Sequence, residues 1–346
     1  MRKSIFSLGK SCCFIILNLL LSSSFACAQS GQKWVSYEPA QGPGNGKHIV
    51  LISGDEEYRS EEALPMLAKI LSNHHGFKTT VLFAIDPKTG EINPDYQGNI
   101  PGLESLQSAD LMVIFTRFRE LPDEQMKYID AYIKSGKPIV GMRTATHAFS
   151  YDENKNSPYA KYSFDSKSKG WEDGFGRQVL GETWIDHHGH HAHEGTRALI
   201  DGIMQRKGHP ILNGVKDIWV PTDVYGTREL TGDPEVLVWG QPTHGMTAES
   251  AVNWEKSVMP IAWTKEYTSE SGKTARVFTT TMGASVDLKS EDLRRLMVNA
   301  CYWALEMEDQ IPEKSKVDIV GKYTPTMFGF GEHKKGMRPA DFVVQQ

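Results

Sequence analysis

The chain has 346 residues, enough for one large domain with extensions, and its formal net charge is −5. A mildly acidic chain is a poor candidate for binding nucleic acid or anionic membrane surfaces, because both carry negative charge. We therefore expect no nucleic-acid partner, and beyond the N-terminal segment the sequence holds no apolar run long enough for a membrane span.

Residues 1–28 are typical of a cleaved bacterial signal peptide. A basic start precedes a short apolar run at 12–21 and a small-x-small cleavage motif at 26–28. The run is too short for a permanent membrane helix. The sequence thus predicts a periplasmic or secreted protein that starts near Gln29. Lipidation of Cys27 is the alternative, and it is disfavoured because a serine stands where a branched aliphatic residue is expected.

Only Cys301 remains after cleavage, since the other three cysteines lie in the signal. An internal disulfide and a thiolate metal site are therefore excluded for the mature chain. Cys301 falls in an apolar helical stretch, so we interpret it as a small core residue.

The mature chain opens with a predicted linker at 29–47, rich in glycine, proline and glutamine. Apolar strands then alternate with helices, which implies crossover connections and a sheet covered on both faces. The predicted fold class is therefore α/β: a flavodoxin-like doubly wound, mainly parallel sheet. The expected strands are 48–54, 77–83, 109–115 and 138–142, and the expected helices are 61–74 and 122–135.

The second half of the chain gives further element signals, and one domain is predicted over 48–306. Residues 307–346 hold aromatic side chains, among them Tyr323, Phe328 and Phe330, so we expect an extension that packs on this domain. The expected helices are 172–180 and 292–305, and the expected strands are 182–185, 235–239, 259–263 and 276–281.

Polar loops follow three of the predicted strands, at 55–59, 116–120 and 143–147. In open α/β sheets ligands bind beyond the carboxyl ends of the strands, so these loops are expected to meet in one crevice. The candidates they supply are Asp55, Arg143 and His147 for catalysis and Glu56, Tyr58 and Arg117 for substrate binding.

The turn after the fourth strand, residues 141–145, holds neither serine nor cysteine. A serine hydrolase or a glutamine amidotransferase of the usual kind is therefore not expected, because both place their nucleophile on such a turn. Arg143 could stabilise developing negative charge there, or it could bond loop carbonyls. The sequence leaves both roles open.

Residues 186–194 read Asp-His-His-Gly-His-His-Ala-His-Glu and hold five of the twelve histidines. Histidine combines metal ligation with proton transfer near neutral pH, so this segment predicts a site for a divalent metal such as zinc. The usual zinc spacings are absent, and the alternatives are hydrogen bonding to a polar substrate or a single active histidine. No nucleotide cofactor is expected. The predicted metal ligands are His187, His188, His191 and His193.

Aromatic residues near these loops suit a carbohydrate, because aromatic faces stack on sugar rings. Phe149 and Tyr225 are predicted to bind the substrate in this way. Asp223 and Met282 end later segments and are expected to line the same crevice.

Six motifs in fixed order resemble the ThuA-like family, named for trehalose utilisation. The likeness runs from about residue 48 to 305, and the tail at 321–331 is similar to an extension of exported members. The family carries a class I glutamine amidotransferase-like fold without the catalytic cysteine. The resemblance further implies a role in sugar catabolism on 3-keto-glycosides made by partner oxidoreductases. Ala284 stands where many members carry histidine, so no role is carried over to that position. The motifs are residues 141–149, 179–181, 187–189, 209–212, 223–225 and 276–283.

A ketone at C3 of a sugar acidifies the protons at C2 and C4. Removing one requires a base and a group that stabilises the enolate. His147 is the predicted base, and Arg143 with a metal or donor at His187 and His188 is the predicted stabiliser. Elimination of the C1 substituent or isomerisation would follow. The alternatives are a non-catalytic carbohydrate-binding module and a metal-dependent hydrolase.

Overall fold

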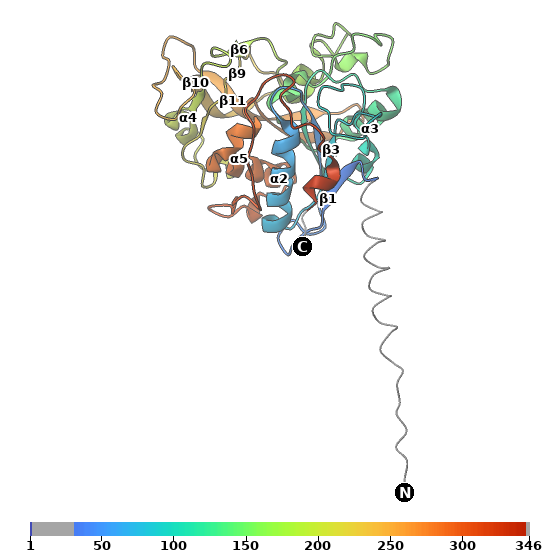
Figure 1. Ribbon diagram of the computed structural model, residues 1–346. Helices are drawn as coiled ribbons and strands as arrows, with labels where there is room; N and C mark the ends of the chain where they lie inside the picture. The colour runs from blue at the N-terminus through green and yellow to red at the C-terminus, as the bar shows by residue number, and fades with distance from the viewer. Residues whose placement is uncertain (2–30, 344–346) are drawn as a thin grey trace.

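The computed structural model describes residue 1 and residues 31–343 (Figure 1). The predicted signal peptide at 1–28 and its cleavage site lie outside the described residues, apart from Met1. Within the described part, no helix has the length and apolar character that crossing a membrane requires.

A ten-stranded mixed sheet forms the centre of the molecule, in the order β1-β3-β2-β4-β5-β12-β11-β10-β7-β8. Five consecutive strands of this sheet, from β3 to β12, are parallel. Numbered by their order in the sequence, they lie side by side as second, first, third, fourth and fifth. That is the flavodoxin-like order, so the predicted fold class is confirmed. These five strands are β2 (His48–Gly54), β3 (Lys78–Phe83), β4 (Leu111–Thr116), β5 (Ile139–Met142) and β12 (Thr274–Thr280).

Antiparallel strands extend the sheet at both edges. Beyond β12 lie four of them: β11 (Met259–Thr268), β10 (Glu235–Pro242), β7 (Thr196–Ala198) and β8 (Trp219–Val220). At the other edge, β1 (Trp34–Tyr37) pairs with β3, although it falls inside the predicted linker. The structure differs there because Val35 and Tyr37 alternate with more exposed neighbours and are buried, a strand pattern too short to stand out.

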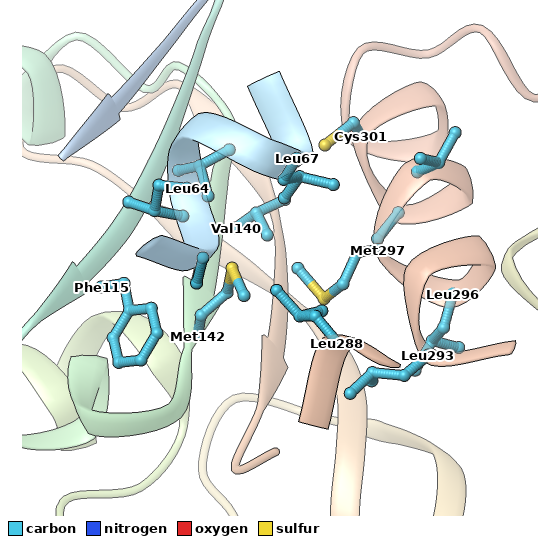
Figure 2. Packing of buried hydrophobic residues seen from close by; sticks show 14 of the residues in the cluster. Leu64, Leu67, Phe115, Val140, Met142, Leu288, Leu293, Leu296, Met297 and Cys301 are labelled. Atoms are coloured by element: carbon cyan, nitrogen blue, oxygen red, sulfur yellow. The ribbon is translucent and has the colours of Figure 1, made fainter. Parts of the chain in front are cut away.

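Helices cover both faces of the sheet. On one face, α2 (Ser60–His75) and α5 (Glu291–Ala304) pack together over β4 and β5, as Figure 2 shows. On the other face, α3 (Asp123–Lys134) packs with the short helix η1 (Leu103–Gln107). Adjacent strand residues such as Val113 and Ile114 belong to opposite faces, which is why these strands read as continuous apolar runs. Cys301 is fully buried in this core, and burial raises the pKa of its thiol to about 12.

The segment before the histidines differs from its predicted elements. Helical structure covers residues 174–180, and Gly176–Leu180 (η4) has π-type hydrogen bonding. Residues 182–185 form no strand. Gly174 and Gly181, with φ of 58° and 107°, bracket this short helix in left-handed conformations that end regular structure. The side chain of Glu182 instead binds Arg228, with one Oε1 to Nη2 distance of 2.7 Å.

The remaining elements are short. A two-stranded antiparallel sheet pairs β6 with β9 apart from the main sheet. These elements are β6 (His187–His188), β9 (Val224–Tyr225), α4 (Ile200–Met204), η2 (Arg143–His147), η3 (Ala160–Tyr162), η5 (Pro210–Leu212), η6 (Ser285–Lys289), η7 (Glu308–Gln310) and η8 (Pro339–Phe342).

The C-terminal extension lies against the domain. In Figure 1 the dark-red segment passes along α2 towards the end of the molecule where β6 and β9 lie, and returns to η8 beside β1. Near α2, the backbone N–H of Thr326 donates to Glu62 Oε2 at 2.7 Å. Beside β1, the hydroxyl of Tyr37 donates to the carbonyl oxygen of Phe342 at 2.9 Å.

Candidate active site

The three polar loops that follow β2, β4 and β5 meet at the carboxyl edge of the sheet. The hydroxyl of Thr144 donates to Asp55 Oδ2 at 2.5 Å, which joins the first loop to the third. The backbone N–H of Phe118 donates to the carbonyl oxygen of His147 at 2.9 Å, which joins the second to the third. Parallel strands bring these loops together because their carboxyl ends share one edge.

The side chain of Asp55 stabilises the conformation of its own loop. The side chain has no exposed surface. Its Oδ1 accepts from the backbone N–H groups of Glu57 and Tyr58 at 2.7 and 2.6 Å, and Oδ2 accepts from Thr144. A carboxylate engaged in this way fixes the turn after β2 and is not free to contact a substrate. The structure therefore gives Asp55 a positioning role in place of the predicted catalytic one.

Arg143 occupies the turn after β5 with a φ of 47°, a left-handed conformation uncommon for a non-glycine residue. Its Nη1 donates to the carbonyl oxygens of Asp223 and Thr281, and its guanidinium lies 3.9 Å from the ring centroid of Tyr58 and 4.7 Å from that of Tyr225. The side chain has no exposed surface. Of the two roles that the sequence left open, the structure supports the one in which Arg143 bonds loop carbonyls.

Arg143 nevertheless adds a fixed positive charge beneath the site. Burial alone would lower its pKa, but Tyr225, Tyr58 and Asp223 together hold the pKa of Arg143 well above its ordinary value. A permanent cation here favours nearby negative charge on the surrounding carboxylates.

Asp223 is the centre of the most compact group of ionisable side chains at this edge. His187 Nδ1 lies 2.5 Å from Asp223 Oδ2, and His191 Nδ1 lies 3.3 Å from Oδ1. His191 Nε2 also lies 3.2 Å from Glu57 Oε1. The group therefore runs from His187 through Asp223 and His191 to Glu57. We call these four residues the acid–base group.

The local fold explains how the acid–base group forms. Asp223 lies directly before β9, and His187 lies on β6, which pairs antiparallel with β9. His187 stands opposite Tyr225 in this register, next to the start of β9. Since successive side chains of a strand point to opposite faces, His188 is turned away from the side that His187 occupies.

The charges within the acid–base group follow from burial and from the partners. Burial alone would raise the pKa of Asp223, but hydrogen bonds from His187 and His191 and the charge of Arg143 hold it well below its ordinary value. The hydrogen bond to Asp223 raises the pKa of His191. Burial raises the pKa of Glu57 even though Arg117 opposes the shift. Asp223 is thus an anion with no exposed surface that binds two partly exposed imidazoles.

The structure brings two of the four predicted metal ligands together and separates the other two. Donor atoms of His187, His191 and Asp223 all lie within 4.8 Å of one another. Two imidazoles and a carboxylate are a donor set that suits zinc, iron or manganese. His188 Nε2 instead donates to the carbonyl oxygen of Ser257 at 2.6 Å, and His193 is exposed, with Nδ1 2.9 Å from the carbonyl oxygen of His191.

His147, the predicted base, lies behind the acid–base group. Only 2% of its surface is exposed, because the rings of Phe118, Tyr225 and Trp184 lie 4.9, 5.2 and 5.5 Å from its own. Burial, with the charges of Arg117 and Arg143, lowers the pKa of His147 well below its ordinary value. A neutral, enclosed imidazole has little access to a substrate, whereas 31% of the His187 side chain is exposed.

The predicted substrate-binding residues divide into two groups. Phe149 and Met282 lie in the hydrophobic core, and Tyr58 and Tyr225 are buried beneath the site, so none of these four presents a stacking surface. Arg117 keeps 18% of its side chain exposed. It forms ion pairs with Glu56 and Glu57, and Glu56 Oε2 also binds buried Arg119 at 2.5 Å. Arg117 is therefore the accessible cation among the predicted residues.

Several residues of the site were not among the sequence candidates. Glu57 stands between two predicted residues, and the acidic run at 55–57 was the available signal. Trp184 precedes the histidine segment, and its ring lies 6.1 Å from that of His187. Partly exposed aromatic rings surround the acid–base group: Phe118, Phe164, Trp184 and Phe328.

Comparison with known proteins adds a family relation. A family model named ThuA and described as trehalose utilisation matches residues 49–304. A solved ThuA-like protein from Parabacteroides merdae is 15% identical, with a TM-score of 0.47, and the alignment covers 86% of this chain and 99% of that one. A second from Bacteroides uniformis is 14% identical, with a TM-score of 0.45, over 78% of this chain and 95% of that one. No curated protein gives a significant match.

Proposed function

The chain belongs to the ThuA family, whose model spans residues 49–304, and from that premise we propose that it is an exported enzyme that acts on a keto-sugar. The family description, trehalose utilisation, supports a carbohydrate substrate. The proposed reaction is removal of a proton next to the ketone of a 3-keto-glycoside, followed by elimination or isomerisation. Sugar oxidoreductases of the same pathway would supply that ketone.

The observation that carries the proposal is the contact between buried Asp223 and half-buried His187, at 2.5 Å. An ionised carboxylate accepts the Nδ1 proton of the imidazole, which leaves Nε2 without a proton and able to accept one from carbon. Asp223 also stabilises the imidazolium that results, as a buried aspartate does for other catalytic histidines. His187 is therefore the base in this proposal, in place of the enclosed His147.

His191 adjoins this pair, and Arg117 is linked to it through Glu57; both groups suit the stabilisation of an enolate. His191 is in ring contact with His187, with centroids 4.5 Å apart, and both of its nitrogens face carboxylates. Arg117 Nε lies 3.5 Å from Glu57 Oε2, so Glu57 links His191 to Arg117. Positive charge fixed in advance beside the developing oxyanion lowers the barrier to proton removal.

The bond changes are the same for either outcome up to the enolate. His187 takes the C2 proton, and the C–H electron pair becomes the enolate. In elimination that pair forms the C1–C2 double bond while the C1 substituent leaves with its own bonding pair and is protonated. In isomerisation the proton of the C2 hydroxyl passes to the C3 oxygen, and the His187 imidazolium returns a proton to C3, so that the carbonyl moves from C3 to C2.

Substitution of His187 tests the proposal. His187→Ala should lower kcat for a 3-keto-disaccharide by at least about a hundredfold, the usual contribution of a general base, in a variant that remains folded by circular dichroism. His193→Ala is the matched control, because His193 is an exposed histidine of the same loop. Turnover by His187→Ala at the wild-type rate would remove His187 from the mechanism. Sugar binding without any turnover in the wild type would favour the binding-module alternative.

A second candidate, metal-assisted catalysis or hydrolysis, is favoured by the grouping of His187, His191 and Asp223 within 4.8 Å. A divalent ion held there would supply Lewis acidity. The positive charge of Arg143, 3.5 Å from Asp223 Oδ1, opposes such binding. Metal analysis of the native protein, followed by assay after chelation, tests this candidate. This candidate would be supported if chelation removes both the bound metal and the activity, and if the His191→Ala variant binds no metal.

Export is part of the proposal and rests on the basic start, apolar run and cleavage motif within 1–28. Mass spectrometry of the native protein should find a chain that begins near Gln29. An intact Met1 would contradict export, and a lipid on Cys27 would change release into anchoring.

A further inference from the structure

A segment of the C-terminal extension, residues 323–330, is fixed across the site, and we call it the strap. The hydroxyl of Tyr323 donates to the carbonyl oxygen of Ser285 at 2.7 Å, and the hydroxyl of Thr326 donates to Glu62 Oε1 at 3.0 Å. Further along, the N–H of Gly329 donates to the carbonyl oxygen of Glu57 at 2.9 Å. The strap is thereby bonded to the same loop that supplies Glu57 to the acid–base group.

Gly329 separates two phenylalanines with different surroundings. Phe328 stacks on Tyr58, with ring centroids 5.4 Å apart and planes 28° apart, and lies 5.3 Å from the ring of His191. Phe330 is 58% exposed, and the Arg117 guanidinium lies 5.1 Å from its ring centroid. Gly329 has a φ of 146°, a conformation that side-chain-bearing residues rarely adopt, so the divergence of the two rings is fixed by the backbone.

The guanidinium of Arg117 is held rigidly behind Phe330. It lies 4.6 Å from the ring of Phe118 on one side and 5.1 Å from that of Phe330 on the other. Its ion pairs with Glu56 and Glu57 fix its plane. An exposed apolar ring beside a cation and two carboxylates combines a flat stacking surface with hydrogen-bonding groups at its edge.

We propose that Phe330, backed by Arg117, is a sugar-stacking subsite that the strap adds to the active site. The apolar face of a pyranose ring would lie on Phe330, and its hydroxyl groups would reach the partly exposed Arg117. Through this contact the C-terminal extension determines which saccharides the enzyme binds. The inference rests on the proposed function for its ligand class, a carbohydrate, but not for the reaction.

Binding of trehalose, which has no ketone, tests the subsite apart from catalysis. Isothermal titration should give a Kd about tenfold higher for Phe330→Ala than for the wild type, as expected for the loss of one stacking ring, while Phe330→Trp binds at least as tightly as the wild type. Met327→Ala is the matched control and should bind like the wild type, because Met327 is an exposed strap residue, 49% accessible, without a contact to Arg117. For a 3-keto-disaccharide, Phe330→Ala should raise KM by a similar factor and leave kcat unchanged.

The outcomes separate the subsite from the proposed reaction. Equal trehalose affinity in Phe330→Ala and the wild type would overturn the subsite, as would a wild type that binds no saccharide. A wild type that binds trehalose through Phe330 but converts no keto-sugar would refute the proposed reaction and support the subsite.

Discussion

At the scale of single residues, the candidate site depends on which polar groups are buried and which reach the surface. Asp223 has no exposed surface, and hydrogen bonds from His187 and His191 together with the charge of Arg143 stabilise its negative charge. Asp223 therefore acts by orienting the side chains of His187 and His191. The same distinction makes Arg143 and Asp55 positioning residues and leaves His187, His191 and Arg117 as the groups able to meet a substrate.

Glu61 offers a test of burial at one residue. It lies in the first turn of α2, and neither carboxylate oxygen has a hydrogen-bond partner among the described residues. Burial raises the pKa of Glu61 from its ordinary value of 4.5 to about 8. A carboxyl group whose pKa is raised by folding makes its full contribution to stability below its unfolded pKa. That contribution is lost as the pH rises through the folded pKa.

Glu61→Gln should therefore raise stability at pH 9, by on the order of 3 kcal/mol, and change it little at pH 4. Urea unfolding of both proteins at the two pH values measures the effect. Glu124→Gln is the matched control, because Glu124 lies in the first turn of α3 and is exposed. An equal effect of Glu61→Gln at both pH values would show that Glu61 does not titrate between them.

At the scale of elements, α2 connects the core to both α5 and the extension. Its last turn carries His75, whose Nε2 lies 2.7 Å from the carbonyl oxygen of Lys316 and whose Nδ1 lies 3.0 Å from the hydroxyl of Tyr302. Nε2 must donate to the carbonyl, so Nδ1 accepts the hydroxyl proton and the ring is neutral. Burial lowers the pKa of His75 to about 4.

A histidine held neutral in this way destabilises the fold when acid forces it to take up a proton. Stability from His75 is complete above its unfolded pKa of 6.5 and is lost as pH falls towards about 4. His75→Gln should flatten the dependence of melting temperature on pH between 6.5 and 4. His74→Gln is the control, since the His74 ring is partly exposed. Parallel curves for wild type and His75→Gln would exclude His75 as a source of acid instability.

The sequence predicted a helix or strand correctly where its hydrophobic pattern was strong. The apolar runs of β2, β4 and β5 are buried on both faces, so they could be predicted from composition alone. β1 could not be predicted in this way. It is an edge strand of four residues in a glycine- and proline-rich segment, so its alternation of buried and more exposed residues is too short to recognise. The strand expected at 182–185 does not form, and the segment follows Gly181, whose φ of 107° ends the preceding helix.

The position of the candidate site could be inferred from the sequence, but the contacts among its side chains could not. The rule that ligands bind at the carboxyl edge located the three loops, and histidine density located His187 and His191. The pairing of His187 with Asp223 joins residues 36 positions apart and depends on the register of β6 and β9, which no local pattern encodes. The exposure that distinguishes His187 from enclosed His147 likewise exists only after folding.

At the scale of the whole molecule, the edge that carries the candidate site is assembled from distant parts of the chain. The parallel strands supply Glu57 and Arg117, the small β6–β9 sheet supplies His187 beside Asp223, and the strap supplies Phe328 and Phe330. A cavity of about 800 Å³ lies elsewhere, lined mainly by α4 and residues 207–216, and contains none of the acid–base group. This cavity is therefore separate from the acid–base group.

The central claim is that His187, oriented by Asp223, removes a proton next to the ketone of a sugar. Incubation of a 3-keto-disaccharide in D₂O, followed by proton NMR, measures that step directly. The wild type should replace the proton beside the ketone with deuterium, and His187→Asn should do so at least about a hundredfold more slowly while remaining folded by circular dichroism. Deuterium incorporation by His187→Asn at the wild-type rate would contradict the claim.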